Sequence, residues 1–248
     1  MKAILTYHSV DGSASPISIG EAAFRNHAEW LARHGPPVVT PAELLLLPPS
    51  EPAVALTFDD AFRSFADVAW PILRNHGLPA TVFVPTAHVG GTNTWGGVNT
   101  RGIPTLPLLD WDQLGRLAEE GVQIGSHTCT HPHLTSLSPA RQHEELGESA
   151  AQLQARLGIR PAGLAYPYGA WNPQVTAAAA LLYDYAVTVD LRPLAPDEDP
   201  LRLPRLDAYY LRDNRLLEAW GTTRLRLYLN ARAGVRRWRA ALVTGHHA

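Results

Sequence analysis

Two segments of the sequence combine residue types that can hold a metal ion. Asp59 and Asp60 follow one apolar run, and His127 and His131 follow another. Adjacent carboxylates repel each other unless their roles differ, and a metal separates the roles when one carboxylate ligates it and the other acts as a base. Imidazoles four residues apart can reach one ion and suit Zn²⁺ and similar divalent ions. Together the segments predict a site with two histidines and one carboxylate, with positions left open for water and substrate.

Each half of this site also has a simpler interpretation. An Asp pair can cap the N-terminus of a helix, and histidine-rich loops occur on protein surfaces by chance. Cys129 lies between the two histidines. At that spacing its side chain should point away from both rings, so we interpret it as a small buried residue rather than a ligand.

Two further stretches could complete an active site. Pro167 and Gly169 fix a sharp turn, which would present the backbone N–H of Tyr168 to an oxyanion, although the turn could be purely structural. The irregular stretch 86–109 is rich in glycine and contains Trp95. Loops of this length tend to be functional or disordered, so it could fold over a site or be a plain surface excursion.

The elements that must position these residues follow a βα pattern. Apolar, strand-like runs alternate with amphipathic helical stretches, as expected for six or seven βα units in one domain. Active-site groups of such folds gather at the carboxyl ends of the strands, where the candidate residues lie. The predicted strands are 53–58, 81–85, 122–126, 163–168 and 185–190. Thr40 to Glu43 form a capping box, and a long helix begins at Ser138 and ends near Gly158.

Composition limits the class of protein. The chain has 248 residues, 46% of them hydrophobic, and a net charge of −2, which favours one globular domain and gives no reason to expect nucleic-acid binding. The single Cys129 excludes a disulfide within the chain. No apolar run approaches the ~20 residues of a transmembrane helix, and no signal peptide is evident, so we expect a cytoplasmic location.

The C-terminal part differs from the rest. Between 212 and 240 there are eight arginines against Asp213 and Glu218, with leucines and aromatic residues interleaved. We therefore divide the chain into a domain over 1–210 and a basic amphipathic helical tail over 211–248. The tail could pack on the domain with a solvated arginine face, or contact an anionic membrane or a lipid-linked glycan.

Three motifs resemble a known family. "TFDDA", "HTCTH" and "YPYG" resemble, in that order, the first motifs of the polysaccharide deacetylases of carbohydrate esterase family 4, the NodB-homology family. The resemblance extends over about residues 1–210. It implies an α/β fold, a distorted (β/α)7 TIM-like barrel, and metal-dependent hydrolysis of N-acetyl groups on amino sugars. By this resemblance Asp59 is the catalytic base, the metal ligands are Asp60, His127 and His131, and the backbone of Tyr168 binds the oxyanion.

The sequence departs from the family in three places. Ala61 stands where the family usually has glycine, the arginine that often precedes the "PY" turn is absent, and so is the late histidine that acts as general acid. Arg205 resembles part of an "LPR" segment found in one branch and could replace the missing arginine beside Asp59. We group Arg205 with Tyr168 and Trp95 as candidate substrate-binding residues, and Trp95 could stack on a sugar ring.

The N-terminal "TYHSV" offers a replacement for the missing histidine. A branch that resembles biofilm poly-N-acetylglucosamine deacetylases begins with such a "YH" pair. His8 ends an apolar, strand-like run, and an imidazole is suited to protonate a leaving amine. We therefore predict that His8 is the general acid, while a core histidine with a structural hydrogen bond remains the alternative.

The resemblance predicts a deacetylase that releases acetate from an N-acetylated amino-sugar saccharide or glycan precursor. Its cofactor would be one divalent metal ion, with Zn²⁺ preferred and Co²⁺ or Ni²⁺ as alternatives. Two other functions stay open. One is a hydrolase of the same barrel type that acts on a non-sugar or cyclic amide. The other is a non-catalytic carbohydrate-binding relative, which Ala61 and the lost arginine favour.

Overall fold

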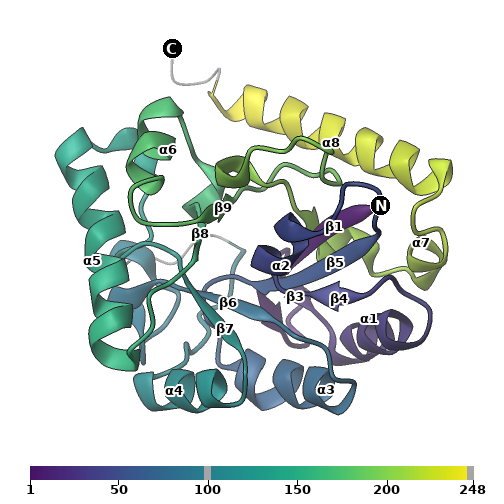
Figure 1. Ribbon diagram of the computed structural model, residues 1–248, viewed down its shortest axis with the longest axis horizontal. Coiled ribbons are helices and arrows are strands. Elements are labelled where there is room, and N and C mark those ends of the chain that lie inside the picture. Colours follow the sequence, from purple (N-terminus) through teal and green to yellow (C-terminus); the bar gives the residue numbers. More distant parts are fainter. Residues whose placement is uncertain (98–101, 245–248) are drawn as a thin grey trace.

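A curled parallel sheet forms the centre of the computed structural model, which describes residues 1–97 and 102–244 (Figure 1). The strand order is β10-β1-β5-β6-β7-β8-β9, and β4 pairs with the first half of β5. The strands of this sheet are β1 (Lys2–Tyr7), β4 (Val38–Val39), β5 (Ala53–Phe58), β6 (Thr81–Val84), β7 (Gln123–Ser126), β8 (Gly163–Ala165), β9 (Tyr185–Val187) and β10 (Leu206–Asp207). A separate pair consists of β2 (Ser9–Val10) and β3 (Ser18–Ile19).

The sheet closes only partly into a barrel. β9 and β10 form no ladder with each other, and a single parallel bridge joins Val187 of β9 to Leu203, which precedes β10. The predicted distorted (β/α)7 barrel is confirmed. Predicted strand 53–58 agrees with β5 residue for residue, whereas 163–168 overextends β8, because the chain turns into a 3₁₀ turn (Pro167–Gly169) soon after Ala165.

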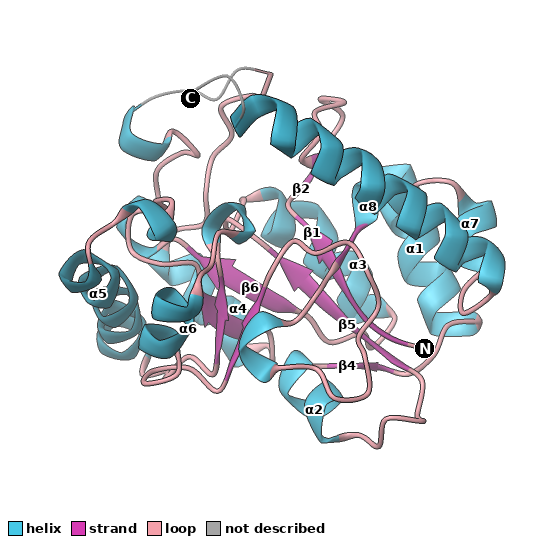
Figure 2. Cartoon of the chain, turned by 90° about the horizontal axis from the view of Figure 1, so that it is seen from above, coloured by secondary structure: helices cyan, strands magenta, loops and turns pink. Residues whose placement is uncertain are grey.

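Helices surround the strands on the outside of the barrel (Figures 1 and 2). The capping box at Thr40 is present, and the long helix begins after Ser138 and ends at Gly158, whose φ of 70° is the left-handed conformation that glycine tolerates. The helices are α1 (Glu21–Arg33), α2 (Pro41–Leu46), α3 (Trp70–Asn75), α4 (Trp111–Glu119), α5 (Pro139–Leu157), α6 (Pro173–Ala179), α7 (Asn214–Glu218) and α8 (Thr223–Thr244).

Side-chain alternation along the strands decides which residues enter the barrel. Ile4 and Ala55 belong to the interior cluster, while their neighbours on each strand pack against the surrounding helices. Because the period of a strand is two residues, Thr57 and Asp59 continue the inward row of β5, and His8 continues that of β1. The strands therefore deliver an imidazole and a carboxylate to the same end of the barrel.

Two glycines make room for the rings that fill the barrel. A Cβ on Gly125 would collide with the ring of Phe83, and a Cβ on Gly163 would collide with the ring of Tyr185. Phe83 and Tyr185 are almost fully buried and belong to one cluster. These contacts explain glycines inside strands, where glycine otherwise weakens the structure.

A buried histidine joins three segments around β1. Tyr7 Oη donates to His27 Nδ1 at 3.0 Å, and His27 Nε2 donates to the carbonyl of Leu211 at 3.0 Å. Burial lowers the pKa of His27 to about 4, so this ring stays neutral at physiological pH. His27 was not predicted from the sequence. It is a core histidine with structural hydrogen bonds, the role that we had considered as the alternative for His8.

The C-terminal helices pack on the barrel. Leu217, Leu225 and Leu229 are buried in the same cluster as the outer side of the strands. The division of the chain at residue 210 stays a prediction. Residues 245–248 of the predicted tail and residues 98–101 of the loop 86–109 lie outside the described residues. Among the described helices, none combines the length and apolar character required to cross a bilayer.

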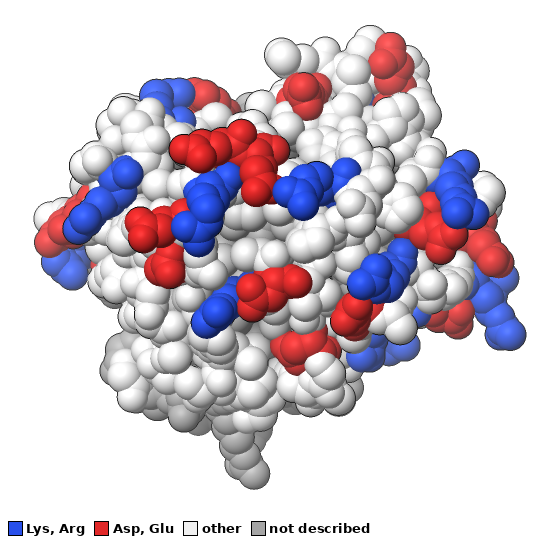
Figure 3. Space-filling model, turned by 90° about the horizontal axis from the view of Figure 1, so that it is seen from below, with Lys and Arg blue, Asp and Glu red and all other residues white. Residues whose placement is uncertain are grey.

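The charge pattern of one face of the molecule differs from that in the sequence of α8. On the face shown in Figure 3, acidic and basic side chains are interspersed. Exposed pairs such as Arg25–Glu21 at 2.7 Å and Arg74–Glu120 at 2.8 Å are of a kind that contributes little to stability. By contrast, the sequence of α8 contains six arginines and no acidic residue.

We expect Gly163→Ala to lower the free energy of unfolding by about 1–3 kcal/mol, because the new methyl group overlaps the ring of Tyr185. Gly147→Ala is the matched control, since its Cβ meets open space on α5 and alanine favours a helix by about 0.5–1 kcal/mol. Urea denaturation of both variants measures the two changes. Equal stability of Gly163→Ala and the parent protein would contradict the packing described here.

Candidate functional site

Three side chains from two strand ends converge at the carboxyl end of the barrel. Asp60 follows β5, and His127 and His131 follow β7. Asp60 Oδ1 lies 3.4 Å from Nε2 of each histidine. All three residues are buried, and their potential ligand atoms lie within 4.8 Å of one another. The structure thus brings together the three residues that the sequence predicted as ligands.

The donor set fits a divalent ion. His127 Nδ1 donates to the carbonyl of Ala165 at 2.7 Å, which leaves the lone pair of Nε2 facing Asp60. Asp60 Oδ1 is buried and has no hydrogen-bond partner among the described residues. A carboxylate oxygen and two imidazole nitrogens with free lone pairs are ligands that Zn²⁺ and similar ions accept.

Electrostatics within the cluster favour a positive charge between these groups. Burial raises the pKa of Asp60, but the facing imidazoles of His127 and His131 outweigh burial and hold this pKa far below its usual range. Burial lowers the pKa of His127, but Asp60 and Asp59 outweigh it and raise this pKa. A divalent cation would supply the same positive charge without a proton.

The turns that present these residues are strained. A non-glycine residue in the left-handed region costs about 1–2 kcal/mol, and such residues cluster at functional sites. Ala61 has a φ of 55°, which gives a physical reason for the glycine usual at this position in the family. The other left-handed residues at the site are Asp60 (φ 70°), Thr128 (φ 66°), His131 (φ 60°) and Tyr168 (φ 59°).

Glu145 on α5 fixes the loop between the two histidines. Its carboxylate accepts from the backbone N–H groups of Cys129 at 3.1 Å and Thr130 at 2.8 Å, and from the Thr130 hydroxyl at 2.6 Å. Cys129 is buried, and its sulfur lies 3.7 Å from Gln152 Nε2 rather than in the Asp–His cluster. The loop is therefore held by a helix residue that lies outside the motif itself.

Sequence analysis missed Glu145, although a signal was present. The inward stripe of α5 consists of Gln142, Glu145, Leu146, Ser149 and Leu153, so polar residues occupy a face that should be apolar. A buried polar group needs a hydrogen-bond partner. An acidic residue on such a stripe therefore indicates that a nearby loop depends on it.

Asp59 forms a bidentate ion pair with Arg205. Arg205 Nη1 and Nη2 donate to the two carboxylate oxygens at 2.6 and 2.7 Å, and both side chains are buried. Burial raises the pKa of Asp59, but the Arg205 guanidinium outweighs it and holds this pKa below its usual value. Arg205 also donates to the carbonyl of Thr188 and to the hydroxyl of Thr57. A direct contact between substrate and this enclosed guanidinium has no support in the geometry.

His8 lies beside the same carboxylate. Its Nε2 is 3.9 Å from Asp59 Oδ2, and the side chain keeps 25% of its surface exposed. This exposure contrasts with His27, whose ring is enclosed and hydrogen-bonded at both nitrogens. His8 is therefore close to Asp59 and open to a ligand.

Aromatic rings line the metal cluster. Trp95 stacks on His131 with ring centroids 4.3 Å apart, and Tyr168 places its ring edge-on to His131 at 4.8 Å. Tyr168 also stacks on His133 at 3.9 Å and is 47% exposed. Within the described part of the chain, the Tyr168 N–H donates no hydrogen bond. Through this stacking, His133 lies next to the aromatic rings of the site.

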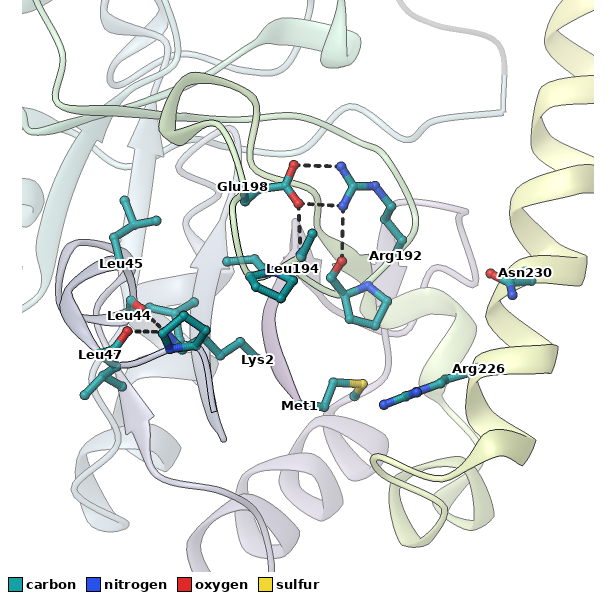
Figure 4. Close-up of a pocket in the computed structure, with 14 residues that line it drawn as sticks. Met1, Lys2, Leu44, Leu45, Leu47, Arg192, Leu194, Glu198, Arg226 and Asn230 are labelled. Carbon is teal, nitrogen blue, oxygen red and sulfur yellow. Dashed lines mark hydrogen bonds and ion pairs between the residues drawn. The ribbon is translucent and has the colours of Figure 1, made fainter. Parts of the chain in front are cut away.

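A cavity of about 680 Å³ lies elsewhere, at the end of the barrel where the strands begin (Figure 4). Lys2 at its wall donates to the carbonyl of Leu44, Arg192 pairs with Glu198 at 2.6 Å, and Arg226 enters from α8. Its lining includes none of the Asp–His cluster. The donor chemistry, rather than the size of a cavity, therefore locates the candidate site.

Two relatives match most of the chain. YxkH of Bacillus subtilis (strain 168) carries the name of a polysaccharide deacetylase. It is 29% identical to this chain over 201 residues, which cover 79% of this chain and 66% of YxkH. The poly-beta-1,6-N-acetyl-D-glucosamine N-deacetylase of Staphylococcus epidermidis is 26% identical over 203 residues, covering 76% of this chain and 67% of that protein. The chain thus spans about two thirds of the length of these curated relatives.

A solved structure and a family model agree with these matches. The Streptococcus pyogenes deacetylase PplD in complex with acetate superposes with a TM-score of 0.71 at 26% identity, covering 83% of this chain and 91% of PplD. The model of the family "Polysaccharide deacetylase" matches residues 47–186, which include the Asp pair, both histidines and the Tyr168 turn. Because that match covers more than half of the sequence, this protein belongs to the polysaccharide deacetylase family.

Proposed function

We propose that this protein is a metal-dependent deacetylase that hydrolyses N-acetyl groups on amino sugars of a saccharide and releases acetate. The observation that carries the proposal is the buried cluster of Asp60, His127 and His131 beside an Asp59 held by Arg205. The names of the relatives support the substrate class, because one acts on poly-beta-1,6-N-acetyl-D-glucosamine and a similar deacetylase structure contains acetate.

The proposed metal ligands are Asp60, His127 and His131, and Zn²⁺ is the ion that we propose, with Co²⁺ or Ni²⁺ as alternatives. When bound, such an ion acts as a Lewis acid that activates water and polarises the acetyl carbonyl. Asp59 accepts the proton of the attacking water. Arg205 donates to both carboxylate oxygens of Asp59 and so fixes the orientation of this carboxylate.

In this proposal, Tyr168 and His8 carry out the remaining steps. The N–H of Tyr168 donates to the oxyanion that forms when water adds to the carbonyl, and one such donor is worth about 3 kcal/mol. His8, which lies 3.9 Å from Asp59, donates a proton to the amine nitrogen as the C–N bond breaks. The products are acetate and the free amino sugar.

The glycine and the arginine whose absence favoured a non-catalytic relative are both replaced in this structure. Ala61 adopts a left-handed φ of 55°, so the turn forms without glycine. Arg205 reaches Asp59 from the segment before β10, which supports the idea that it replaces the arginine missing near the "PY" turn. We therefore favour a catalytic protein over a binding protein. The expected cytoplasmic location stays a prediction.

Acetate release from short N-acetylglucosamine oligomers tests the reaction. We expect release by metal-loaded protein and none after chelation. His127→Ala should lose both bound metal and activity because it removes a ligand. Asp59→Asn should keep the metal but lower kcat by at least about 10²-fold, because it removes the base. Metal analysis and an acetate assay on each variant measure these effects. A folded, metal-bound protein that releases no acetate would contradict the proposal and favour another acyl substrate or a binding role.

The general-acid role of His8 has its own test. We expect His8→Ala to lower kcat by about 10²–10⁴-fold with little change in melting temperature, because the ring is partly exposed and its loss leaves no large cavity. His143→Ala, on the exposed face of α5, is the control and should change neither quantity. An inactive His8→Ala protein that is also unfolded would instead indicate a structural histidine.

We also propose that the outer side of α8 contacts an anionic membrane surface. Leu225 and Leu229 pack on the barrel, whereas Leu227 (65% exposed), Val235 (43%) and Trp238 (65%) do not. The spacing of these three residues puts them on one side of the helix. Arginines and no acidic residues accompany them in the helix sequence, a combination that favours anionic lipid.

Co-sedimentation with lipid vesicles measures this contact. We expect binding to vesicles that contain phosphatidylglycerol and weaker binding to pure phosphatidylcholine, because the arginines need negative headgroups. The double variant Leu227→Ser and Trp238→Ser should lose most of the binding. Leu181→Ser, a substitution of a leucine that is 74% exposed outside α8, is the matched control. If the double variant binds as well as the parent protein, α8 is not the contact.

A further inference from the structure

The two histidines of the proposed metal site differ in how their rings are held. His127 Nδ1 donates a 2.7 Å hydrogen bond to the carbonyl of Ala165, the kind of contact that usually orients a metal-ligating histidine. His131 Nδ1 is buried and has no hydrogen-bond partner among the described residues. The left-handed backbone of His131 adds a conformational cost. Among the described residues, contacts other than a hydrogen bond to Nδ1 must therefore orient this ring.

Aromatic contacts are available for this purpose. The ring of Trp95 lies face to face with His131, at a centroid distance of 4.3 Å and an interplanar angle of 24°. Tyr168 meets the same imidazole edge-on at 4.8 Å and 72°. Offset-stacked and edge-on pairs of this kind contribute about 0.5–1.5 kcal/mol beyond the area that they bury. The two contacts restrict both the plane and the tilt of the His131 ring.

Trp95 is itself held by the loop that carries it. Two residues before it, Asn93 is buried, and its side chain donates to the carbonyl of Pro104 at 3.0 Å and accepts from the N–H of Leu106 at 2.8 Å. The ring of Trp95 also meets His88 edge-on at 4.9 Å. These contacts close the base of the loop, so that Trp95 is presented to His131 from an anchored segment.

The same loop is tied to the Asp pair. Leu109 N–H donates to the carbonyl of Ala61 at 2.8 Å, directly after the proposed ligand Asp60. The loop therefore joins the two strand ends that supply the ligands, because it is bonded to one and stacked on the other. In the sequence, this loop is separate from the "HTCTH" motif whose second histidine it contacts.

We propose that Trp95 is a positioning residue for the metal ligand His131. Stacking fixes the imidazole so that Nε2 faces the ion, and it takes the place of the hydrogen bond that His131 Nδ1 lacks. The inference rests on the proposed metal site and adds a residue to it. It also changes the expectation from sequence, because the face of Trp95 that covers His131 is not available to a sugar ring.

Metal affinity tests this role independently of turnover. Co²⁺ and Zn²⁺ dissociation constants, measured by competition with a chelator, are compared for the parent protein, Trp95→Leu and Trp95→Phe. We expect Trp95→Leu to weaken binding by about 10-fold, the lower end of the effect of residues that orient ligands. Trp95→Phe, which keeps a ring, should restore most of the affinity. The visible spectrum of the Co²⁺ form should change in Trp95→Leu because the position of His131 is less well fixed.

Two controls separate this role from a general loss of tryptophan packing or of folding. Trp111→Leu removes a tryptophan from α4, outside the site, and should leave both dissociation constants unchanged. Melting curves of the metal-free proteins show whether a variant is folded. If leucine destabilises the fold, Trp95→Met, which keeps apolar bulk without a ring, gives the same comparison.

Two outcomes would overturn the inference. If Trp95→Leu binds metal as tightly as the parent protein while KM for the acetylated substrate rises, Trp95 contacts the sugar and does not position His131. If the parent protein binds neither ion, the proposed metal site fails together with the inference. Tight binding by the parent protein therefore distinguishes failure of this inference from failure of the proposed function.

Discussion

Two adjacent carboxylates, both nearly inaccessible to solvent, set the central constraint on this structure. Asp59 and Asp60 are 3% and 6% exposed, and a buried negative charge is tolerated only with a positive partner. Asp59 receives its partner from the protein, because Arg205 crosses from the segment before β10 to bind both of its oxygens. Asp60 faces two imidazoles instead, and in our proposal its partner is the divalent ion. In this proposal, the different partners give the two residues different chemical roles.

The strained turns at the strand ends follow from this constraint. Consecutive residues of a strand point to opposite sides, so a chain that continued straight after Asp59 would turn Asp60 away from the barrel. A left-handed conformation at Asp60 redirects it toward His127 and His131. Contacts from outside the motifs offset the cost. Glu145 bonds the histidine loop, and the loop that carries Trp95 is bonded to Ala61.

Local rules made much of the fold predictable. The strand at 53–58 and the helix limits at Thr40, Ser138 and Gly158 depend on hydrophobic runs and capping residues that lie next to each other in sequence. The candidate ligands were predictable for a related reason, because the carboxyl ends of parallel strands meet at one end of a barrel. The end of β8 was placed three residues too late, since its apolar run continues into a turn.

Contacts across long sequence separations were not predictable in the same way. Glu145 acts on backbone groups about fifteen residues earlier, and Trp95 covers a histidine in another loop. His27 was overlooked because no residue near it in the sequence indicates a hydrogen bond to the distant carbonyl of Leu211. Such contacts depend on how elements pack, which periodicity and capping rules do not encode.

A crystal structure of the zinc-loaded protein, with anomalous diffraction to locate the ion, tests the central claim most directly. Our account predicts one ion bound to Asp60 and to Nε2 of His127 and of His131 at about 2.0–2.2 Å, with Asp59 still paired with Arg205. An ion bound to Asp59 in place of Asp60, or an ion located away from both histidines, would contradict the division of roles between the two carboxylates.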